Sequence, residues 1–399
     1  MRIAFITPEF VTEEYYSGGL ANYLHRISMV LAGLGHDVHI IVLSTNDDKS
    51  FKFGASWIHR LQIQPRRSWA RVLFRRFLYD AGQWTAFAYR AWRKLEALNK
   101  IAPVDIVQLA NYRACGLCVV AFSNIPHVTR LSSLHRVWHE ATGIQRHFGI
   151  LAIEWLEWMQ LRYCRHVYAP SQVLASMLSA KTHSKTIIIL RSPVFIETSL
   201  LDEQLYRDRL AGRRYLLFVG RYELHKGIDI LARALPQILA TLPDCEAVLV
   251  GRDSASALGP SMKEYVHQNC AGFAPRLHFL DQVPHQQLYP IIAGARLMVL
   301  PSLVDNLPNT MLEAMSFGCP VVGTIGASFD ELIEDNISGF LVPRHDPDAL
   351  AKKVIAAWNH PNRESIGQAG QRVVEQLKPE VAVARLVDYY REVLNSERN

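Results

Sequence analysis

The sequence predicts two α/β domains, each built on a doubly wound parallel sheet of the Rossmann type. Three observations lead to this fold class. The chain has 399 residues, a length at which a single hydrophobic core usually splits into two domains. Short apolar segments alternate with segments of helical periodicity, which indicates parallel sheets covered on both faces. This alternation starts twice, at residue 2 and again at residue 215.

The first half of the chain begins with a strand, a Gly-containing loop at 17–19 and a helix at Leu20–Gly33. Further short apolar runs follow the same rule of strand, loop and helix. The expected strands are Arg2–Thr7, Asp37–Leu43, Ile106–Gln108, His127–Arg130, Val167–Ala169 and Thr186–Leu190. Pro193 breaks the last of them, so we expect a first domain over residues 1–195.

The second half repeats this pattern with a loop at Gly220–Gly227 and a helix at Ile228–Leu242, after a polar helix expected at Asp202–Arg214. The expected strands are Tyr215–Val219, Glu246–Val250, Leu277–Phe279, Leu297–Leu300, Pro320–Gly323 and Gly339–Val342. Residues 196–378 therefore form a second domain. A last helix at 379–395 has apolar residues near a 3.6 period, and we expect it to pack back on the first domain.

Charge is distributed unevenly along the chain. Residues 1–195 contain 23 Lys and Arg against 12 Asp and Glu, a balance of +11, and the remainder contains 20 against 25, a balance of −5. The basic half is expected to meet an anionic surface or acceptor. No apolar run reaches the roughly 18 residues of a spanning helix, and the N-terminus has the pattern of a strand and not of a signal peptide. A cytoplasmic location, peripheral on the inner face of a membrane at most, is therefore expected.

The six cysteines are scattered along the sequence. Cys115 and Cys118 form a CxxC without a second pair, which favours core residues over a metal site or a disulfide.

Polar and Gly residues follow several of the expected strands, at the sheet edge where doubly wound folds bind ligands. Gly18 and Gly19 precede a helix, whose N-terminus offers free N–H groups to an anion. Arg221 and Lys226 stand five residues apart in a Gly-bounded loop, so both can reach a pyrophosphate. Solvated loop charges would have the same spacing.

The loop at 301–308 leads into a helix and holds Asp305, with Glu313 eight residues later. Asn309 and Thr310 would present backbone N–H groups at the first helical turn, where a diphosphate is best stabilised. Glu313 lies about one turn further along and could accept hydrogen bonds from a ribose. The alternative is an ordinary helix start with incidental acids. The segment 318–343 that follows has the pattern of packing residues.

Together these segments resemble the signature of glycosyltransferase family 4, the group 1 glycosyltransferases, which have the GT-B fold of two Rossmann-like domains facing a central cleft. Asp305 and Glu313 match its carboxylate pair, and 313–342 matches the pattern that follows it. Gly18-Gly19, the loop at 220–227 and Ala169–Ser171 occur in the family's order and spacing. The resemblance covers nearly the whole chain.

The resemblance implies a retaining, metal-independent transferase without a cofactor. It would move a sugar from a UDP- or GDP-linked donor to a glycan, lipid-linked or small-molecule acceptor in polysaccharide or glycoconjugate biosynthesis, with no nucleic-acid partner. Arg221 and Lys226 would neutralise the leaving diphosphate, and Asp305 would hold hydroxyls of the sugar. The remaining donor contacts are expected at Gly18, Gly19, Gly220, Arg252, Asn309, Thr310 and Glu313.

Two positions depart from the family pattern. The first acid of the pair is usually Glu and is Asp305 here, one methylene shorter. A His common after the strand at 127–130 corresponds to Ser132, whose hydroxyl can orient a sugar but carries no positive charge. His135, three residues on, is a second acceptor-side candidate.

The stretch Arg60–Arg76 contains six arginines, Arg66 and Arg67 among them, interleaved with aromatic residues. An interfacial basic helix that docks on anionic lipid has this composition. So does an exposed charged face above a buried aromatic stripe, which would continue through Trp84, Phe87 and Trp92.

Other functions of Rossmann-like folds fit the sequence less well. A nicotinamide-dependent oxidoreductase would need a GxGxxG after the first strand, with an acid about 20 residues on. A non-catalytic two-lobed sugar-binding protein would need export, and a phosphorylase would need a Lys context for pyridoxal phosphate that the sequence lacks.

Overall fold

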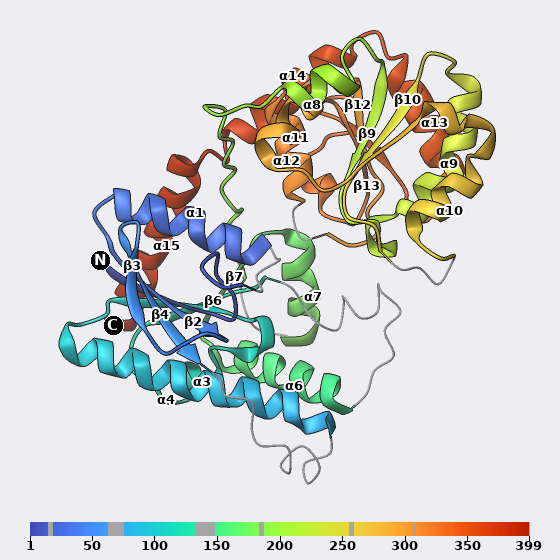
Figure 1. Ribbon diagram of the computed structural model, residues 1–399. Helices are drawn as coiled ribbons and strands as arrows, with labels where there is room; N and C mark the ends of the chain where they lie inside the picture. Colours follow the sequence, from blue (N-terminus) through green and yellow to red (C-terminus); the bar gives the residue numbers. More distant parts are fainter. Residues whose placement is uncertain are drawn as a thin grey trace. The chain divides into compact units, whose positions relative to one another are not determined.

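The computed structural model describes residues 1–14, 19–62, 76–132, 148–182, 187–254, 259–305 and 308–398. The chain divides into two compact units (Figure 1). Unit 1 comprises Met1–Pro193 and Pro379–Asn399, and unit 2 comprises Val194–Lys378. Each unit is a sheet between helical layers, and the predicted class of two doubly wound α/β sheets is confirmed.

Unit 1 has an eight-stranded sheet in the order β3-β4-β2-β1-β5-β6-β7-β8. All neighbours are parallel except β3 and β4, which form an antiparallel hairpin at one edge. The strands are β1 Arg2–Thr7, β2 Asp37–Ser44, β3 Ser50–Phe53, β4 Ser56–Gln62, β5 Ile106–Ala110, β6 His127–Arg130, β7 His166–Ala169 and β8 Ile188–Ile189. Strand order reverses between β1 and β5, so the crevice of this sheet opens beside their carboxyl ends.

Helices cover both faces of this sheet (Figure 1). Ile27 of α1 and Val383 and Tyr390 of α15 are fully buried in the core on one face, and Phe87 of α3 is fully buried in the core on the other. The helices are α1 Gly19–Gly33, α3 Arg76–Ile101, α4 Leu117–Phe122, α6 Phe148–Tyr163, α7 Gln172–Thr182 and α15 Pro379–Arg398. The final helix thus supplies core residues to the unit that holds the N-terminus.

Unit 2 has a six-stranded sheet in the order β11-β10-β9-β12-β13-β14, parallel throughout. The strands are β9 Tyr215–Val219, β10 Glu246–Val250, β11 Leu277–Leu280, β12 Leu297–Leu300, β13 Val321–Thr324 and β14 Phe340–Val342. The reversal of strand order between β9 and β12 puts the ligand-binding crevice of this sheet at their carboxyl ends.

The helices of unit 2 also form two layers (Figure 1). Buried residues of α9 Ile228–Thr241, α10 Met262–Asn269 and α13 Pro347–Trp358 form the core on one face. Buried residues of α11 His285–Gly294 and α12 Asn309–Ser316 belong to the core on the other, and α14 Arg363–Glu375 packs on α12. The helix expected at Asp202–Arg214 is shorter, α8 Gln204–Arg209, because the chain leaves helical geometry at Leu210 and turns through Gly212 at φ +79°.

All six cysteines are buried and unpaired. Burial raises the pKa of the Cys270 thiol to about 11 and that of Cys245 to about 12, so both stay protonated near neutrality. Cys115 and Cys118 are core residues in the same way. Of the helices in the described ranges, none combines the length and apolarity that crossing a bilayer requires.

Candidate active site

The loop after β9 lies directly against the loop after β12, at the switch point of the unit 2 sheet. Gly227 ends the first loop with φ +70°, and a Cβ there would lie 1.9 Å from the carbonyl oxygen of Pro301. Only glycine fits this position. The backbone N–H of Leu303 donates to the carbonyl oxygen of His225 at 2.8 Å, which joins the two loops through their main chains.

Two predicted catalytic residues meet across this junction. Lys226 Nζ donates to Asp305 Oδ2 at 2.5 Å, although the two residues are 79 positions apart. The side chains are 27% and 13% exposed, so the ion pair is partly shielded from water. Ser328 Oγ donates to the Asp305 carbonyl oxygen at 3.0 Å and fixes the backbone of that loop. The pair is a preformed combination of one cation and one carboxylate at the sheet edge.

The same loop contains two residues that sequence reasoning missed, Glu223 and His225. Arg221 Nη1 lies 2.8 Å from Glu223 Oε1, and His225 Nδ1 lies 3.1 Å from Glu223 Oε2. Burial, together with the charges of Lys226 and Arg221, lowers the pKa of His225 to about 4. The imidazole is therefore neutral near pH 7, and the positive charge of this loop belongs to Arg221 and Lys226. The only sequence signal for Glu223 and His225 was their place between those two residues.

Helix α12 begins beside these loops. Its first intrahelical hydrogen bond runs from Met311 N to Pro308 O at 3.0 Å, and no side chain caps its N-terminus. The backbone N–H groups of Asn309 and Thr310 lie ahead of that bond, and Asn309 is exposed. Such N–H groups favour an anion.

Glu313 lies one turn into α12 and is only 6% exposed. His285, the first residue of α11, holds it with Nε2 at 3.4 Å from Glu313 Oε1. The His285 ring contacts Tyr289, whose ring contacts Phe317 after α12, with centroids 5.5 and 5.2 Å apart. Sequence reasoning missed His285, whose only signal was a helix start just after Pro284.

Gly220 and Arg252 lie at the carboxyl ends of the neighbouring strands β9 and β10. Gly220 N donates to Val250 O at 3.0 Å, and a Cβ on Gly251 would lie 1.9 Å from the Gly220 carbonyl oxygen. The Arg252 carbonyl accepts from Tyr222 N at 3.0 Å, and the residue is exposed. The candidate donor-binding residues of unit 2 therefore follow β9, β10 and β12 at one edge of the sheet.

The unit 1 candidates are only partly described. Gly19 is the exposed first residue of α1. Ser132 follows β6, where its N–H donates to Asn111 Oδ1 at 2.6 Å and its Oγ accepts from Arg130 Nη1 at 2.9 Å. Gly18, Arg66, Arg67 and His135 lie outside the described residues.

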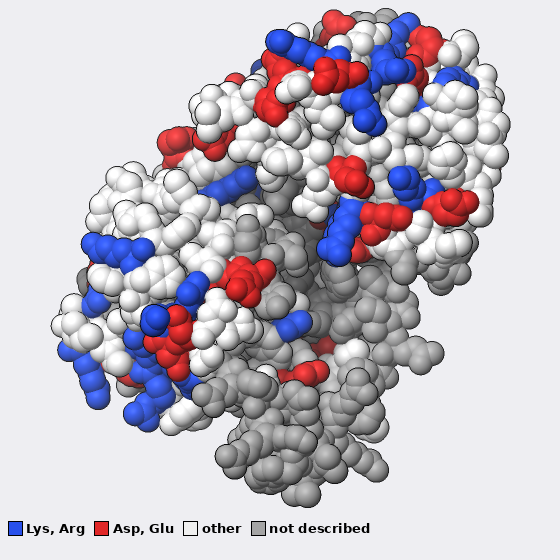
Figure 2. Space-filling model, viewed as in Figure 1, with Lys and Arg blue, Asp and Glu red and all other residues white. Residues whose placement is uncertain are grey.

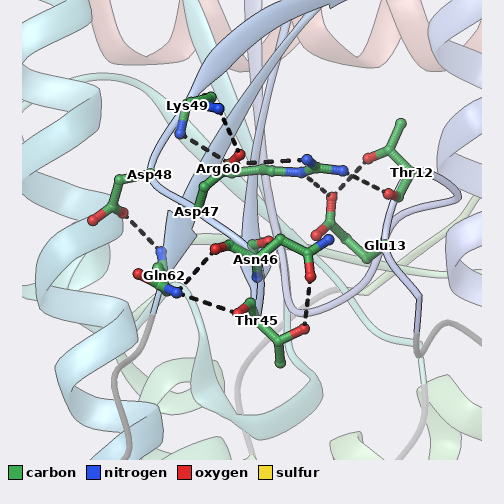
Figure 3. A network of polar contacts seen from close by, with 10 residues as sticks. Thr12, Glu13, Thr45, Asn46, Asp47, Asp48, Lys49, Arg60 and Gln62 are labelled. Atoms are coloured by element: carbon green, nitrogen blue, oxygen red, sulfur yellow. Dashed lines mark hydrogen bonds and ion pairs between the residues drawn. The ribbon is translucent and has the colours of Figure 1, made fainter.

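Arg60 does not belong to a basic helix. It lies in β4 and is 17% exposed, with its Nε 2.8 Å from Glu13 Oε1 and its Nη2 donating to the Thr12 carbonyl at 2.8 Å. Figure 3 shows the guanidinium between Glu13 and Asp47, in a network of polar contacts near the carboxyl ends of β2 and β4. The interpretation of Arg60–Arg76 as one interfacial helix is wrong at its start, because a buried carboxylate pairs with Arg60. Residues 63–75 lie outside the described ranges.

The aromatic residues further along support the second interpretation for α3. Phe87 is buried, and Trp84 and Trp92 pack partly buried against the same core. Figure 2 shows basic and acidic side chains interleaved on both units on the face drawn.

Two family models match this chain. The model described as Glycosyl transferases group 1 matches residues 213–360, and that described as Glycosyltransferase Family 4 matches residues 17–191. An uncharacterized glycosyltransferase of Methanocaldococcus jannaschii is 23% identical over 90% of both chains. A phosphatidyl-myo-inositol mannosyltransferase of Mycobacterium leprae is 28% identical over 45% of this chain, and the match spans 47% of that relative. A D-inositol 3-phosphate glycosyltransferase of Corynebacterium diphtheriae is matched over 37% of its own length.

Solved structures share the fold over the full chain. A sucrose-phosphate synthase of Thermosynechococcus elongatus superposes with a TM-score of 0.78 at 21% identity and covers 99% of both chains. HepE of Anabaena, in complex with UDP and glucose, has a TM-score of 0.69 at 17% identity and covers 98% of this chain and 100% of its own.

Proposed function

We propose that this chain, which belongs to glycosyltransferase family 4, transfers a sugar from a UDP- or GDP-linked donor to an acceptor with retention of configuration and without a divalent metal. The donor would bind at the switch point of unit 2, and the acceptor would bind unit 1. The observation that carries the proposal is the Lys226–Asp305 pair next to Arg221 and the uncapped start of α12. The complexes of HepE with UDP and glucose and with UDP-glucose support a nucleotide-sugar donor.

In the proposed reaction, negative charge builds on the β-phosphate as the glycosidic bond breaks. Lys226 and Arg221 are the cations that would stabilise it, and the N–H groups of Asn309 and Thr310 would add the field of a helix N-terminus. His225 would not share this role near neutrality, because its pKa is lowered to about 4. The leaving phosphate itself would help to deprotonate the acceptor hydroxyl.

The carboxylates would hold the two ends of the donor. Asp305 would accept hydroxyls of the transferred sugar, and Lys226 keeps its side chain oriented before the donor arrives. Glu313 would accept from the ribose, with His285 fixing its carboxylate. Two positioned carboxylates of this kind would set the orientation of the sugar relative to the diphosphate.

On the acceptor side, the +11 balance of residues 1–195 supports an anionic acceptor or membrane surface. A glycan, a lipid-linked or a small-molecule acceptor would fit, in polysaccharide or glycoconjugate biosynthesis. The Mycobacterium leprae relative acts, by its name, on a phosphatidyl-inositol, which supports the lipid-linked class.

Substitutions at the site, followed by binding and turnover measurements, distinguish the roles proposed for the Glu313 and Asp305 carboxylates. Calorimetry should give Glu313→Gln a weaker affinity for both free nucleotide and nucleotide-sugar. Asp305→Asn should bind free nucleotide like the wild type and lose turnover, and Lys226→Met should lose roughly 10²–10³ in turnover, the size found for a lost oxyanion donor. The matched control is Lys353→Met, which removes a comparable ion pair with Asp335 away from the site. Wild-type turnover in Lys226→Met, or a reversed carboxylate pattern, contradicts the assignment.

A further inference from the structure

Arg130, at the carboxyl end of β6, is a buried cation whose partners among the described residues are all neutral. It is 6% exposed. Its Nη1 donates to Ser132 Oγ at 2.9 Å and its Nη2 to Ser192 Oγ at 3.0 Å, while the Tyr23 ring lies 3.9 Å from its Cζ. Its Nε is buried and has no hydrogen-bond acceptor in the part of the chain that the structure describes.

No described carboxylate lies within ion-pair distance of this guanidinium. The polar groups beneath it are also neutral: Tyr168 and Tyr390 both donate to the Gln108 side-chain oxygen at 2.6 Å. Burial raises the pKa of both phenols well above the usual value, so neither supplies a negative charge near neutrality. Arg60 shows the usual arrangement in the same unit, since the buried carboxylate of Glu13 compensates it.

A buried cation without a counter-ion is costly, and buried charges in proteins are normally paired. Arg130 stands where ligands of such a sheet bind, because it ends a strand next to the β1–β5 switch point. Asn111, which follows β5, receives the N–H of Ser132 and ties that position to the switch point. The missing partner is therefore expected to be a ligand.

We propose that Arg130, with the hydroxyls of Ser132 and Ser192, binds a phosphate group carried by a substrate. A guanidinium matches the geometry and charge of a phosphate, and Nε–H is a donor still to be used. A serine hydroxyl that accepts a hydrogen bond keeps its own hydrogen to donate, so Ser192 can face the same anion. The site deepens the proposed function, on which its assignment to a substrate rests.

Phosphate could come from two sources, a phosphorylated acceptor or the donor diphosphate. Gly19, where the donor diphosphate is expected, lies one helical turn before Tyr23 in α1. The chemistry at Arg130 is the same for both, and the experiment separates them.

Inorganic phosphate is the probe, titrated calorimetrically into the full-length protein at constant ionic strength. The wild type should bind it, Arg130→Gln should lose at least about tenfold in affinity, and Ser192→Ala should lose less. Arg60→Gln is the matched control, since it removes a partly shielded arginine of the same unit that already has its carboxylate, and it should keep the wild-type affinity. Without phosphate, Arg130→Gln should unfold no earlier than the wild type, whereas Arg60→Gln should unfold earlier.

Wild-type phosphate affinity in Arg130→Gln overturns the proposal. A second result would also overturn it: Arg130→Gln folds but unfolds earlier than the wild type, and its phosphate affinity is no lower than that of Arg60→Gln. Arg130 would then serve only to join α1 to β6.

Repeating the phosphate titration with saturating UDP or GDP identifies the source of the phosphate group. An acceptor phosphate predicts binding alongside the nucleotide and an unchanged nucleotide affinity in Arg130→Gln. A donor diphosphate predicts competition and weaker nucleotide binding in that variant. Failure of the proposed function would appear differently, as no sugar transfer from any nucleotide-sugar while phosphate still binds at Arg130.

Discussion

The substitution Gly227→Ala should damage the junction between the β9 and β12 loops more than an ordinary loss of a left-handed glycine. At φ +70° a side chain costs roughly 1–2 kcal/mol in backbone energy. The added Cβ would start 1.9 Å from the Pro301 carbonyl oxygen and needs at least 3.0 Å, so the loops must separate by about 1 Å. Strain of that kind in a packed region costs about 1–3 kcal/mol more, which makes a total of roughly 2–5 kcal/mol.

Gly212→Ala is the matched control for this effect. Gly212 has φ +79° and lies in the same unit, but nothing stands within 4 Å of its added Cβ. It should therefore cost only the roughly 1–2 kcal/mol of the left-handed backbone. Urea unfolding of unit 2 measures both variants in the same transition.

Turnover adds a second measurement. Separating the loops moves Lys226 away from Asp305, and a 1 Å misplacement of reacting groups costs about 10²-fold in rate. Gly227→Ala should therefore lose turnover on that scale while Gly212→Ala keeps it. Equal unfolding midpoints for the two variants, together with wild-type turnover in Gly227→Ala, would refute the reasoning.

Other perturbations follow from the same structure. His59 is buried, and its pKa is lowered to about 3. Between about pH 6.5 and pH 3 the unfolded chain therefore binds a proton that the folded chain does not, so unit 1 should lose stability as pH falls through this range. The urea midpoints at pH 7 and pH 4.5 should differ less in His59→Gln than in the wild type. Arg60→Gln should destabilise unit 1 by about 3–5 kcal/mol because it leaves the buried Glu13 unpaired, and adding Glu13→Gln should recover part of that loss in a double-mutant cycle. His285→Ala should weaken nucleotide affinity roughly threefold to tenfold by releasing the Glu313 carboxylate, with turnover at saturating donor nearly unchanged in a steady-state assay. Sugar transfer should persist in excess EDTA, since cations of the protein would stabilise the leaving group; a loss beyond about tenfold that magnesium restores would argue for a metal.

Most of the sheet could be predicted from the sequence, because central parallel strands are short apolar runs that local composition identifies. The β3–β4 hairpin could not. Its strand β4 carries the buried His59 and the partly buried Arg60, polar residues that the sheet accommodates because His39 stacks on the first and Glu13 pairs with the second. Those partners come from other segments of the chain, so the local pattern favoured assigning Arg60 to the arginine-rich stretch Arg60–Arg76 and not to a strand.

The residues of the candidate site could likewise be predicted only in part. Lys226 and Asp305 were predicted separately as catalytic residues, since each lies in a loop with recognisable spacing. Their ion pair depends on the crossover that brings β9 and β12 together and on Gly227 admitting Pro301. His285 pairs with Glu313, and Arg130 contacts Tyr23 and Ser192, neighbours far along the chain that a one-dimensional pattern does not contain. Glu223 pairs with its near neighbours Arg221 and His225, but their spacing alone does not show that the three side chains meet.

The return of the chain to unit 1 affects the order in which the protein can be completed during synthesis. Unit 2 is one uninterrupted segment, Val194–Lys378, whereas unit 1 needs segments from both sides of unit 2. Val383 and Tyr390 of α15 are fully buried in the unit 1 core, and they are synthesised only after the whole of unit 2. A nascent chain stopped before Pro379 would therefore hold a finished unit 2 and a unit 1 with one apolar face still uncovered. Such a chain is expected to need chaperone protection until α15 has been synthesised and can pack on unit 1.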